Sequence, residues 1–519
     1  MSHLFNLQQV FILLPLLFLF ITSLVPISAK VAGTKLSHNF ITIEVMLGIL
    51  LAIVSIFTFP SSQSLIFFNA LKLDAIVEHV AALILISLFF SVLFLKNNTT
   101  FTSRQFEEKL FLLLNAAIGL ILMLWANDLL IMFIGLEYAS LSLYILILLS
   151  RSSFFSREAA IKYFLLGSFF SVILLYGLSF IYGSVGSLYF SELLNISYNI
   201  FSMSRLFSLG VLLVLSGLFF KVAIVPFHSW LPDVYEGAES AVVSFMASAI
   251  KLVVFIVLLK FAYLDIALGL KGATLLNILQ WLSALSILVG SVAALKQVKL
   301  KRIIAYSSIA HSGYLLIAIT VAMKEESSYA LVSSLYYLLS YTILTVAAFG
   351  IISYLEQYKQ EKALANTDST EKEDKDISLL VSDLKSLLYT APVLAISLIV
   401  VLLGLAGIPP TFGFFAKFLV LLSALKEGLF WLSIWAIIGS IISLYYYFKP
   451  IITMCLSKDD LEPSVFSFPK RSLKNSLWSQ GHLFSIVILA FLSLVLGFFS
   501  QTIISFLFQI LKTFIEYKV

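Results

Sequence analysis

The stretch Leu388–Val420 reads LYTAPVLAISLIVVLLGLAGIPPTFGFFAKFLV and contains one charged residue, Lys417. Its first part is near the roughly 20 apolar residues that cross a bilayer as a helix. The whole stretch is too long for one such span, and it contains Gly407 followed closely by Pro409 and Pro410. It therefore predicts a membrane-spanning helix that is broken in its middle, with a lysine just after the break.

The rest of the chain has the same apolar character. Hydrophobic residues make up 61% of the 519 residues and charged residues only 12%, against about 25% charged in an average soluble domain. Further apolar runs extend over Leu275–Leu295 and over Val242–Val257, the latter interrupted by Lys251. Because these runs are rich in Leu, Ile and Phe and do not alternate strictly, they indicate helices and argue against a β-barrel. The predicted fold class is an all-α polytopic membrane protein.

The residue types that hold metals and redox groups are scarce. Cys455 is the single cysteine, which excludes an internal disulfide, a multi-cysteine iron–sulfur site and a four-cysteine zinc site. The six histidines are scattered, and the sequence has no glycine-rich dinucleotide fingerprint and no phosphate-binding loop. We therefore expect the chain to bind no metal or cofactor itself, and nothing in it indicates a nucleic-acid partner.

Hydropathy predicts about fourteen spans. The first is interpreted as a retained span rather than a signal peptide, because no Lys or Arg precedes Lys30. The spans centre on residues 10–28, 41–60, 76–95, 110–126, 128–149, 161–183, 206–230, 240–262, 274–295, 303–323, 328–355, 387–425, 430–448 and 483–511.

The distribution of basic residues supports this count. Loops after odd-numbered spans hold 22 Lys and Arg residues and loops after even-numbered spans hold 6, while two more lie at the C-terminal end. By the positive-inside rule, this asymmetry places both termini outside. Of the 33 basic residues, only three fall inside predicted spans: Lys221, Lys251 and Lys417.

Charges at the centre of a bilayer cost at least ~2.5–3.5 kcal/mol on insertion scales, so they indicate function. Snorkelling of a long side chain to the interface is the alternative for any one lysine, but mid-span depth makes it a poor explanation for all three. Glu137 is the acid that falls in the middle of a span, because Asp128 lies at a span boundary, where it is a solvated residue or a helix cap.

This set of side chains fits proton transfer. Desolvation favours the neutral form of a lysine, and a nearby carboxylate favours the charged form. A Glu–Lys pair that opens and closes would therefore switch the proton affinity of Lys221, and Lys251 and Lys417 would pass protons onward. His228 would share a helix face with Lys221 if the helix continued through Pro226; a relay and a structural histidine both stay open.

The prolines suggest a repeat. Pro226 in the seventh span and Pro409-Pro410 in the twelfth each lie near a lysine. Two broken spans five apart predict two inverted five-helix repeats, spans 4–8 and 9–13, although ordinary proline kinks are the alternative. The predicted units are an N-terminal three-helix segment over 1–109, repeats over 110–262 and 274–448, and a C-terminal loop and helix over 449–519. A polar loop over 356–385 is expected to be a solvated connector, with a docking site as the alternative.

Four motifs resemble a known family. They are FKVAIVPFHSWLPDVYEG at 220–237, AND at 126–128 leading to Glu137, LKR at 300–302 followed by AYSSI at 305–309, and GLAGIPP at 404–410 followed by GFFAK at 413–417. In this wording and order they are similar to the antiporter-like subunit 2 family of respiratory complex I, whose bacterial members are called the N-type subunit.

The resemblance implies a fourteen-helix proton-translocating module of the membrane arm, driven by NADH:quinone electron transfer elsewhere. Glu137 matches the family's fifth-helix glutamate, and the three lysines match those of the broken seventh, the eighth and the broken twelfth helices. NADH, FMN, iron–sulfur clusters and quinone would belong to other subunits. The implied partners are the other membrane-arm subunits, including the sister subunit 4 and small membrane subunits, together with lipids.

The chain departs from the family pattern after Gly237, where Ala238-Glu239-Ser240 replaces a proline-containing stretch. Ser240 is expected to cap the next helix. Two other functions stay open, a subunit of a multisubunit Na+/H+ antiporter and a stand-alone secondary transporter. The expected location is the mitochondrial inner membrane, with the bacterial plasma membrane as the alternative.

Overall fold

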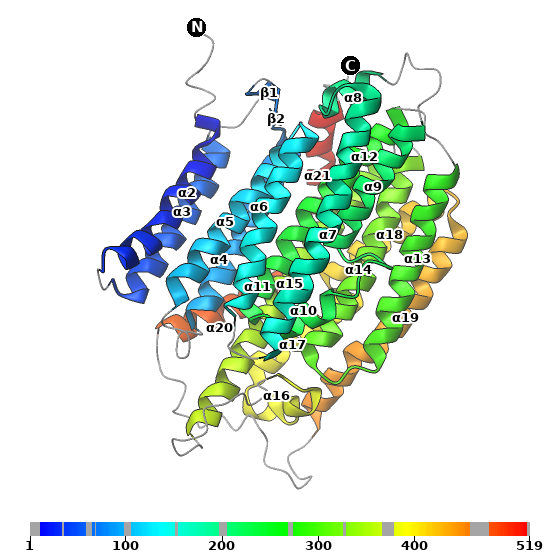
Figure 1. Cartoon of the computed structure of the whole chain (residues 1–519). Helices are drawn as coiled ribbons and strands as arrows, with labels where there is room; N and C mark the ends of the chain where they lie inside the picture. The colour runs from blue at the N-terminus through cyan, green and yellow to red at the C-terminus, as the bar shows by residue number, and fades with distance from the viewer. Residues whose placement is uncertain are drawn as a thin grey trace.

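Long apolar helices run side by side through the computed structural model, and the start of α2 (Leu14–Val31) lies at the same end of the bundle as α21 (Ser500–Ile515) (Figure 1). Twelve helices in the described part of the chain are long and apolar enough to cross a membrane. The polytopic all-α class is therefore confirmed, whereas the count of fourteen spans stays a prediction. The structure describes residues 11–33, 36–58, 65–67, 69–97, 105–150, 154–196, 205–267, 273–324, 328–365, 378–456 and 477–515.

The N-terminal segment pairs two helices, adds a two-stranded antiparallel hairpin in which Leu65 pairs with Lys72, and ends in a third helix. Its elements are α2 (Leu14–Val31), α3 (His38–Thr58), β1 (Leu65–Ile66), β2 (Leu71–Lys72) and α4 (Ala75–Asn97).

The first predicted repeat contains α5 (Phe106–Trp125), α6 (Leu129–Leu148), α7 (Phe154–Val185), α8 (Phe190–Ile196), α9 (Arg205–Lys221), α10 (Leu231–Gly237), α11 (Ser240–Phe245), the π-helix η2 (Met246–Ile250) and α12 (Lys251–Ala267). Asp128 caps α6, because its side chain accepts a hydrogen bond from the Leu130 N–H at 2.6 Å. Helices α5 and α6 cross where a Cβ on Gly119 or on Gly135 would lie 2.7 Å from the carbonyl oxygen of the other glycine.

The second predicted repeat contains α13 (Ala273–Leu295), α14 (Leu300–Lys324), α15 (Ser328–Ala365), the 3₁₀-helix η3 (Val381–Leu384), α16 (Leu387–Thr390), α17 (Pro392–Ala406), α18 (Phe412–Lys426) and α19 (Phe430–Cys455). Its first two helices also cross at a glycine: a Cβ on Gly290 would lie 2.6 Å from the Ala310 nitrogen. The inverted relation between the repeats and the boundaries of the four units stay predictions.

The seventh span is broken five residues earlier than its proline. Helix α9 ends at Lys221, and Pro226 lies in the turns that lead to α10. Other helices satisfy the backbone of these turns, since Ser286 accepts from the Val225 N–H at 3.0 Å and Ser312 donates to the Val222 carbonyl at 2.7 Å. A break inside a membrane protein is tolerated when the freed backbone groups find such partners.

The twelfth span is broken as predicted. Helix α17 ends at Ala406, and Gly407 adopts a left-handed φ of 81° at its C-cap, the conformation that favours glycine. Helix α18 then begins at Phe412. A Cβ on Gly413 would lie 1.9 Å from the Gly404 carbonyl oxygen, so the two half-helices approach each other closely.

Three predicted features need correction. The polar loop does not begin at 356, because α15 continues to Ala365 and Glu356 is buried in an ion pair; residues 366–377 of the loop lie outside the described residues. Ser240 does not cap α11, since its hydroxyl donates to Glu356 instead. The last predicted span, 483–511, consists of two helices, α20 (Leu477–Phe498) and α21 (Ser500–Ile515).

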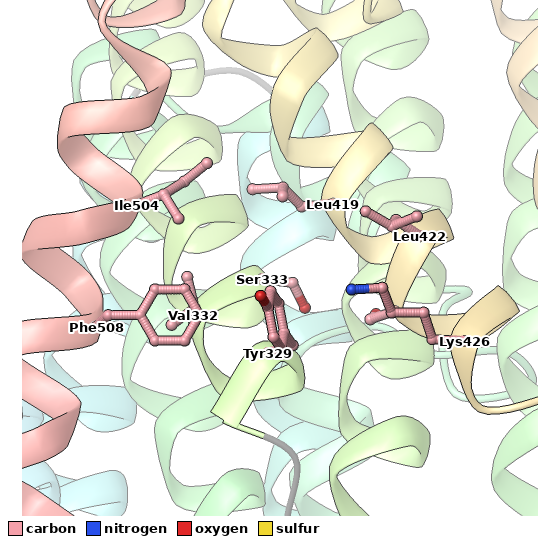
Figure 2. A pocket seen from close by; sticks show the side chains of 9 residues that line it. Tyr329, Val332, Ser333, Leu419, Leu422, Lys426, Ile504 and Phe508 are labelled. Atoms are coloured by element: carbon pink, nitrogen blue, oxygen red, sulfur yellow. The ribbon is translucent and has the colours of Figure 1, made fainter.

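Helices α20 and α21 follow α15 in the opposite direction. His482 on α20 donates to the Gly350 carbonyl at 3.0 Å, and Phe508 on α21 packs against Tyr329 with ring centroids 5.2 Å apart. A small pocket opens between α15, α18 and α21, where the Lys426 ammonium lies 4.1 Å from the Tyr329 ring centroid (Figure 2). Its volume of about 30 Å³ is room for a few water molecules.

Candidate functional site

Glu137 on α6 and Lys221 on α9 form an ion pair. The Lys221 ammonium lies 3.7 Å from Glu137 Oε1 and donates to Ser140 Oγ at 2.8 Å and to the Tyr144 hydroxyl at 3.2 Å. These three partners share one face of α6, because their spacing is three and four residues. Three oxygens thus surround an ammonium that has three N–H groups.

Lys221 lies deeper than its acidic partner. It is the last residue of α9 and is 3% exposed. Glu137 is less deeply placed, with 22% of its side chain exposed, and accepts a hydrogen bond from Ser171 Oγ at 2.5 Å.

Lys251 lies directly after the π-helix η2 and is 2% exposed. Its ammonium donates to the Ser308 carbonyl on α14 and lies 4.8 Å from the centroid of the Tyr341 ring, within the range of a cation–π contact. The Ser312 hydroxyl, one turn further on α14, contacts both the Ser308 and the Val222 carbonyls. Helix α14 therefore connects Lys251 to the break that follows Lys221.

Lys417 lies at the second break, and its contacts differ from those of Lys221. Its ammonium donates to the Ala406 carbonyl at 2.7 Å, which is the end of half-helix α17. It also lies 5.3 Å from the Tyr314 ring centroid. The second broken helix therefore offers the negative end of a half-helix to a buried lysine, whereas Lys221 is held by side chains of α6.

His311 fills the space between Lys251 and Lys417, and sequence reasoning missed it. The ring is 5% exposed and lies within electrostatic range of both lysines. Its Nδ1 lies 2.7 Å from the Tyr337 hydroxyl and its Nε2 lies 3.3 Å from the Tyr447 hydroxyl. Its position two residues after the AYSSI motif is the only signal for it in the sequence.

His228 is not brought to the lysines. A helix face shared with Lys221 requires a continuous helix, and α9 ends at Lys221. The ring is partly exposed in the turns before α10, and within the described residues no hydrogen bond or ion pair joins it to a lysine. The structure thus buries Lys221, Lys251, Lys417 and His311, places the partly exposed Glu137 beside Lys221, and leaves His228 outside this group.

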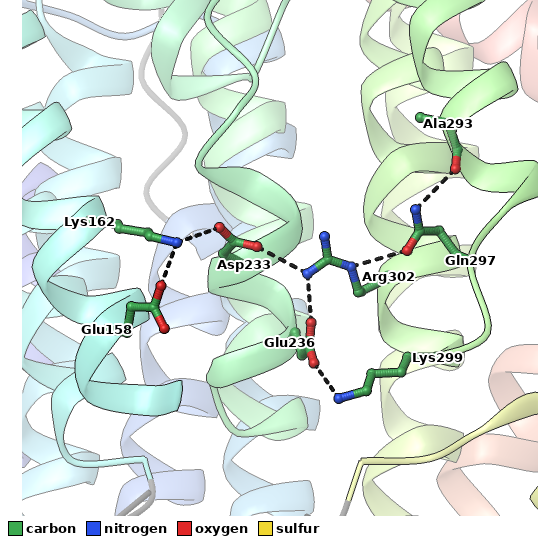
Figure 3. Close-up of polar contacts among 8 residues, drawn as sticks. All are labelled: Glu158, Lys162, Asp233, Glu236, Ala293, Gln297, Lys299 and Arg302. Atoms are coloured by element: carbon green, nitrogen blue, oxygen red, sulfur yellow. Dashed lines mark hydrogen bonds and ion pairs between the residues drawn. The ribbon is translucent and has the colours of Figure 1, made fainter. Parts of the chain in front are cut away.

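A network of partly exposed charges links α7, α10 and α14 (Figure 3). Asp233 on α10 accepts from Lys162 on α7 at 2.9 Å and from Arg302 on α14 at 3.0 Å. Glu236 accepts from Arg302 and from Lys299, each at 2.7 Å. This network therefore ties α10, the short helix after the first break, to α14.

A second cluster of charges is buried, and sequence reasoning missed it as well. We call it the charge tetrad: Lys109 pairs with Glu239 at 2.7 Å, and Lys301 pairs with Glu356 at 3.1 Å. Hydropathy assigns Lys109 and Lys301 to loops, but both side chains are at most 2% exposed. No pattern in the sequence predicts that these four residues meet.

Comparisons with known proteins agree with this architecture. The family model described as "NADH:quinone oxidoreductase/Mrp antiporter, TM" matches residues 126–443. NADH-quinone oxidoreductase subunit N of Bdellovibrio bacteriovorus is 39% identical over 460 residues, covering 88% of this chain and 91% of that protein. Subunit N 1 of Chloroherpeton thalassium is 35% identical and covers 89% and 90%.

Two solved structures have folds similar to that of this chain. A chain of respiratory complex I from Thermus thermophilus is 28% identical, with a TM-score of 0.74 and coverage of 95% of this chain and 98% of that one. A chain of the Mrp complex from Dietzia is 20% identical with a TM-score of 0.73, covering 97% and 96%. The latter likeness concerns the fold alone.

Proposed function

Because the chain belongs to the NADH:quinone oxidoreductase/Mrp antiporter family, we propose that it is a proton-translocating subunit in the membrane arm of respiratory complex I. The observation that carries the proposal is the row of buried groups from the Glu137–Lys221 pair through Lys251 to Lys417. As a subunit of NADH:quinone oxidoreductase, it would have no redox chemistry of its own, and other subunits would hold NADH, FMN, iron–sulfur clusters and quinone.

The geometry supports a switch at the first lysine. When Glu137 is charged and near, it stabilises the Lys221 ammonium; when it moves away, low dielectric favours release of the proton. Ser140 and Tyr144 can hold the amine in either state, because each hydroxyl both donates and accepts. The proton then passes to Lys251 through the region of Ser308 and Ser312.

Beyond Lys251, the groups that connect the two remaining lysines are His311 and the tyrosine hydroxyls around it. A histidine that contacts one hydroxyl at each ring nitrogen can take up a proton at one nitrogen and release one from the other. Lys417 would be the last buried carrier. His228 is proposed only as an accessory group, since it lies outside this row.

The membrane in which the chain resides is inferred from its relatives. Both curated relatives described above are bacterial, which favours the plasma membrane of a bacterium over the mitochondrial inner membrane. The partners would be other membrane-arm subunits, including the sister antiporter-like subunit 4, small membrane subunits and lipids.

A subunit of an Mrp-type Na+/H+ antiporter is the second candidate, because the family model includes that class. The Mrp structure is only 20% identical, whereas the two subunit N relatives reach 35–39%. Dependence of proton movement on sodium would favour this candidate, and dependence on NADH oxidation would favour complex I.

The experiment uses the assembled complex in sealed vesicles. Glu137→Ala and Lys221→Ala are each expected to lower either the protons moved per electron or the coupled quinone reductase rate, because loss of a proton-transfer group slows the transfer step by about 10²–10⁴-fold. Glu192→Gln, a substitution of an exposed acid, is the control. If both quantities survive intact in the assembled Glu137→Ala and Lys221→Ala enzymes, the relay assignment is wrong.

A further inference from the structure

The charge tetrad defined above is one connected cluster. Lys301 on α14 donates to the Ala238 carbonyl at 2.8 Å, directly before Glu239 in the chain. Ser240, directly after Glu239, donates to Glu356 Oε2 at 2.8 Å. The short segment 238–240 therefore joins the Lys109–Glu239 pair to the Lys301–Glu356 pair.

Stability alone does not account for these residues. Their side chains are 0–7% exposed, and removing each ion from water costs several kcal/mol. Apolar residues of similar volume in place of a buried ion pair are often neutral or stabilising. Two such pairs in contact with one three-residue segment therefore point to a use of the charges themselves.

A stripe of buried serines leads from the charge tetrad to Lys251. Ser240, Ser244 and Ser248 are spaced by four residues, so they follow one face of the helix formed by α11 and η2, and each is 0% exposed. Ser91 on α4 adds a fourth hydroxyl, 2.6 Å from that of Ser244. Each four-residue step rises about 6 Å, a gap that one water molecule bridges with two hydrogen bonds.

The stripe ends where the helix geometry changes. The π-helix η2 contains Ser248 and lies immediately before Lys251, whose backbone N–H donates to the Ser248 carbonyl. A π-turn inserts an additional residue in a helix and occurs often at functional sites. It sets the position of Lys251 relative to the serines.

The other side of the charge tetrad reaches the surface. Lys359 follows Glu356 by three residues on α15, so the two share a helix face. The Lys359 side chain is 23% exposed and pairs with Asp383 at 2.7 Å. A partly exposed lysine, paired with the buried Asp383, thus lies one turn from the buried carboxylate of Glu356.

We propose that the charge tetrad and the serine stripe form a proton-loading path from the partly exposed Lys359 to Lys251. The carboxylate of Glu356 accepts one proton and releases it to the Ser240 hydroxyl, which it contacts. The hydroxyls and their bridging waters each accept one proton and release one, and the neutral amine of Lys251 becomes an ammonium while Glu356 returns to a carboxylate. One proton moves, no electron is transferred, and only O–H and N–H bonds form and break. This path rests on the proposed function, because it delivers protons to Lys251, one of the lysines of the proposed relay.

The first test removes the charges of one pair while keeping its volume. In the assembled complex, the double variant Lys109→Met/Glu239→Met should assemble as the wild type does, yet its coupled quinone reductase rate or its protons per electron should fall to the level of the Glu137→Ala enzyme. Glu108→Gln is the matched control, because it neutralises the adjacent residue, which forms a half-exposed pair with Lys30. An assembled double variant with both quantities unchanged overturns the proposal.

The second test acts on the stripe and does not depend on whether the double variant assembles. Ser244→Ala should lower the same quantities, whereas Ser87→Ala, which removes an equally buried hydroxyl bonded only to its own helix, should not. Equal behaviour of the two serine variants contradicts the path. If Ser244→Ala is silent and Glu137→Ala is impaired, the path fails and the proposed function stands; if Glu137→Ala is also silent, the proposed function fails too.

Discussion

Gly407 and Lys417 depend on each other at the second break. Gly407 takes the left-handed conformation that ends α17, and a Cβ at that position would lie 2.7 Å from Lys417 Cδ. The lysine therefore folds back over a residue that has no side chain, which brings its ammonium to the Ala406 carbonyl. The position of the buried charge is set by a neighbour that carries no functional group.

Gly407→Ala is expected to impair proton transfer by displacing Lys417. The left-handed conformation costs an alanine roughly 1–2 kcal/mol, and the added methyl group must also push the lysine away. Gly428→Ala is the control, because Gly428 has a similar φ of 74° and nothing within 4 Å of its Cβ. The coupled quinone reductase rate should fall several-fold in the first variant only; equal rates in both would show that Lys417 is not displaced.

The two histidines show what residue types alone cannot tell. His228 attracts attention in the sequence because it follows Lys221 and Pro226, but its relation to the lysine depends on a helix that ends before it. His311 stands in an apolar helix without a charged neighbour in the sequence. It meets Tyr337 and Tyr447 only because α14, α15 and α19 pack together.

At the scale of elements, the prolines predicted that spans seven and twelve are broken, but not where each helix ends. Helix α9 stops at Lys221, well before Pro226, because Trp230 and Ser312 supply hydrogen bonds to the carbonyls of Phe220 and Val222. Those partners come from later parts of the chain. A local pattern therefore locates a break to within about one or two turns.

Helix α15 ends later than predicted, whereas α9 ends earlier. Its last residues are polar, and the pattern indicates a solvated loop from residue 356. The helix continues because Glu356 faces inward to Lys301 and Ser240, while Lys359 pairs with Asp383. Charged residues appear as loop in a hydropathy profile whether they meet water or an opposite charge.

The network around Asp233 is expected to hold α10 against α7 and α14. Burial alone would raise the pKa of Asp233, but hydrogen bonds from Lys162 and Arg302 outweigh it and lower that pKa. Since the side chain is about a third exposed, Asp233→Asn should destabilise the fold by only about 1 kcal/mol. The measurement is the temperature at which the assembled complex loses quinone reductase activity.

The sign of the pH dependence follows from the lowered pKa. The contribution of Asp233 is fully present above the unfolded value of 3.8 and is lost as the pH falls through the folded value. The difference between wild type and Asp233→Asn should therefore stay constant between about pH 5 and pH 8. A difference that disappears already at pH 6 would assign the stabilisation to another group; Glu192→Gln is the control.

At the scale of the whole molecule, α14 contacts buried lysines and carries both His311 and one residue of the charge tetrad. It contacts the break after Lys221 through Ser312, Lys251 through Ser308, and the space before Lys417 through His311. Its first turn holds Lys301 of the charge tetrad. One helix thus contacts the buried groups near both breaks.

The membrane class, most spans, both breaks and the three buried lysines could be predicted from the sequence, because each has a local signal: an apolar run, a proline or an isolated charge. The sequence could not predict the charge tetrad or His311. Lys109 and Lys301 lie at helix starts, and whether a residue there meets water or a carboxylate from a distant helix is decided by packing. The departure at Glu239 was visible, but its partner Lys109 lies 130 residues away.

The central claim is that the buried lysines act as one series. The direct measurement is the number of protons moved per electron by assembled Lys221→Met, Lys417→Met and double-variant complexes in the same vesicles. If the lysines act in series, each single variant loses proton movement and the double variant is no worse than the more impaired single variant, as for groups that act as a unit. Losses that add in the double variant, or single variants that move protons at the wild-type ratio, would contradict the account.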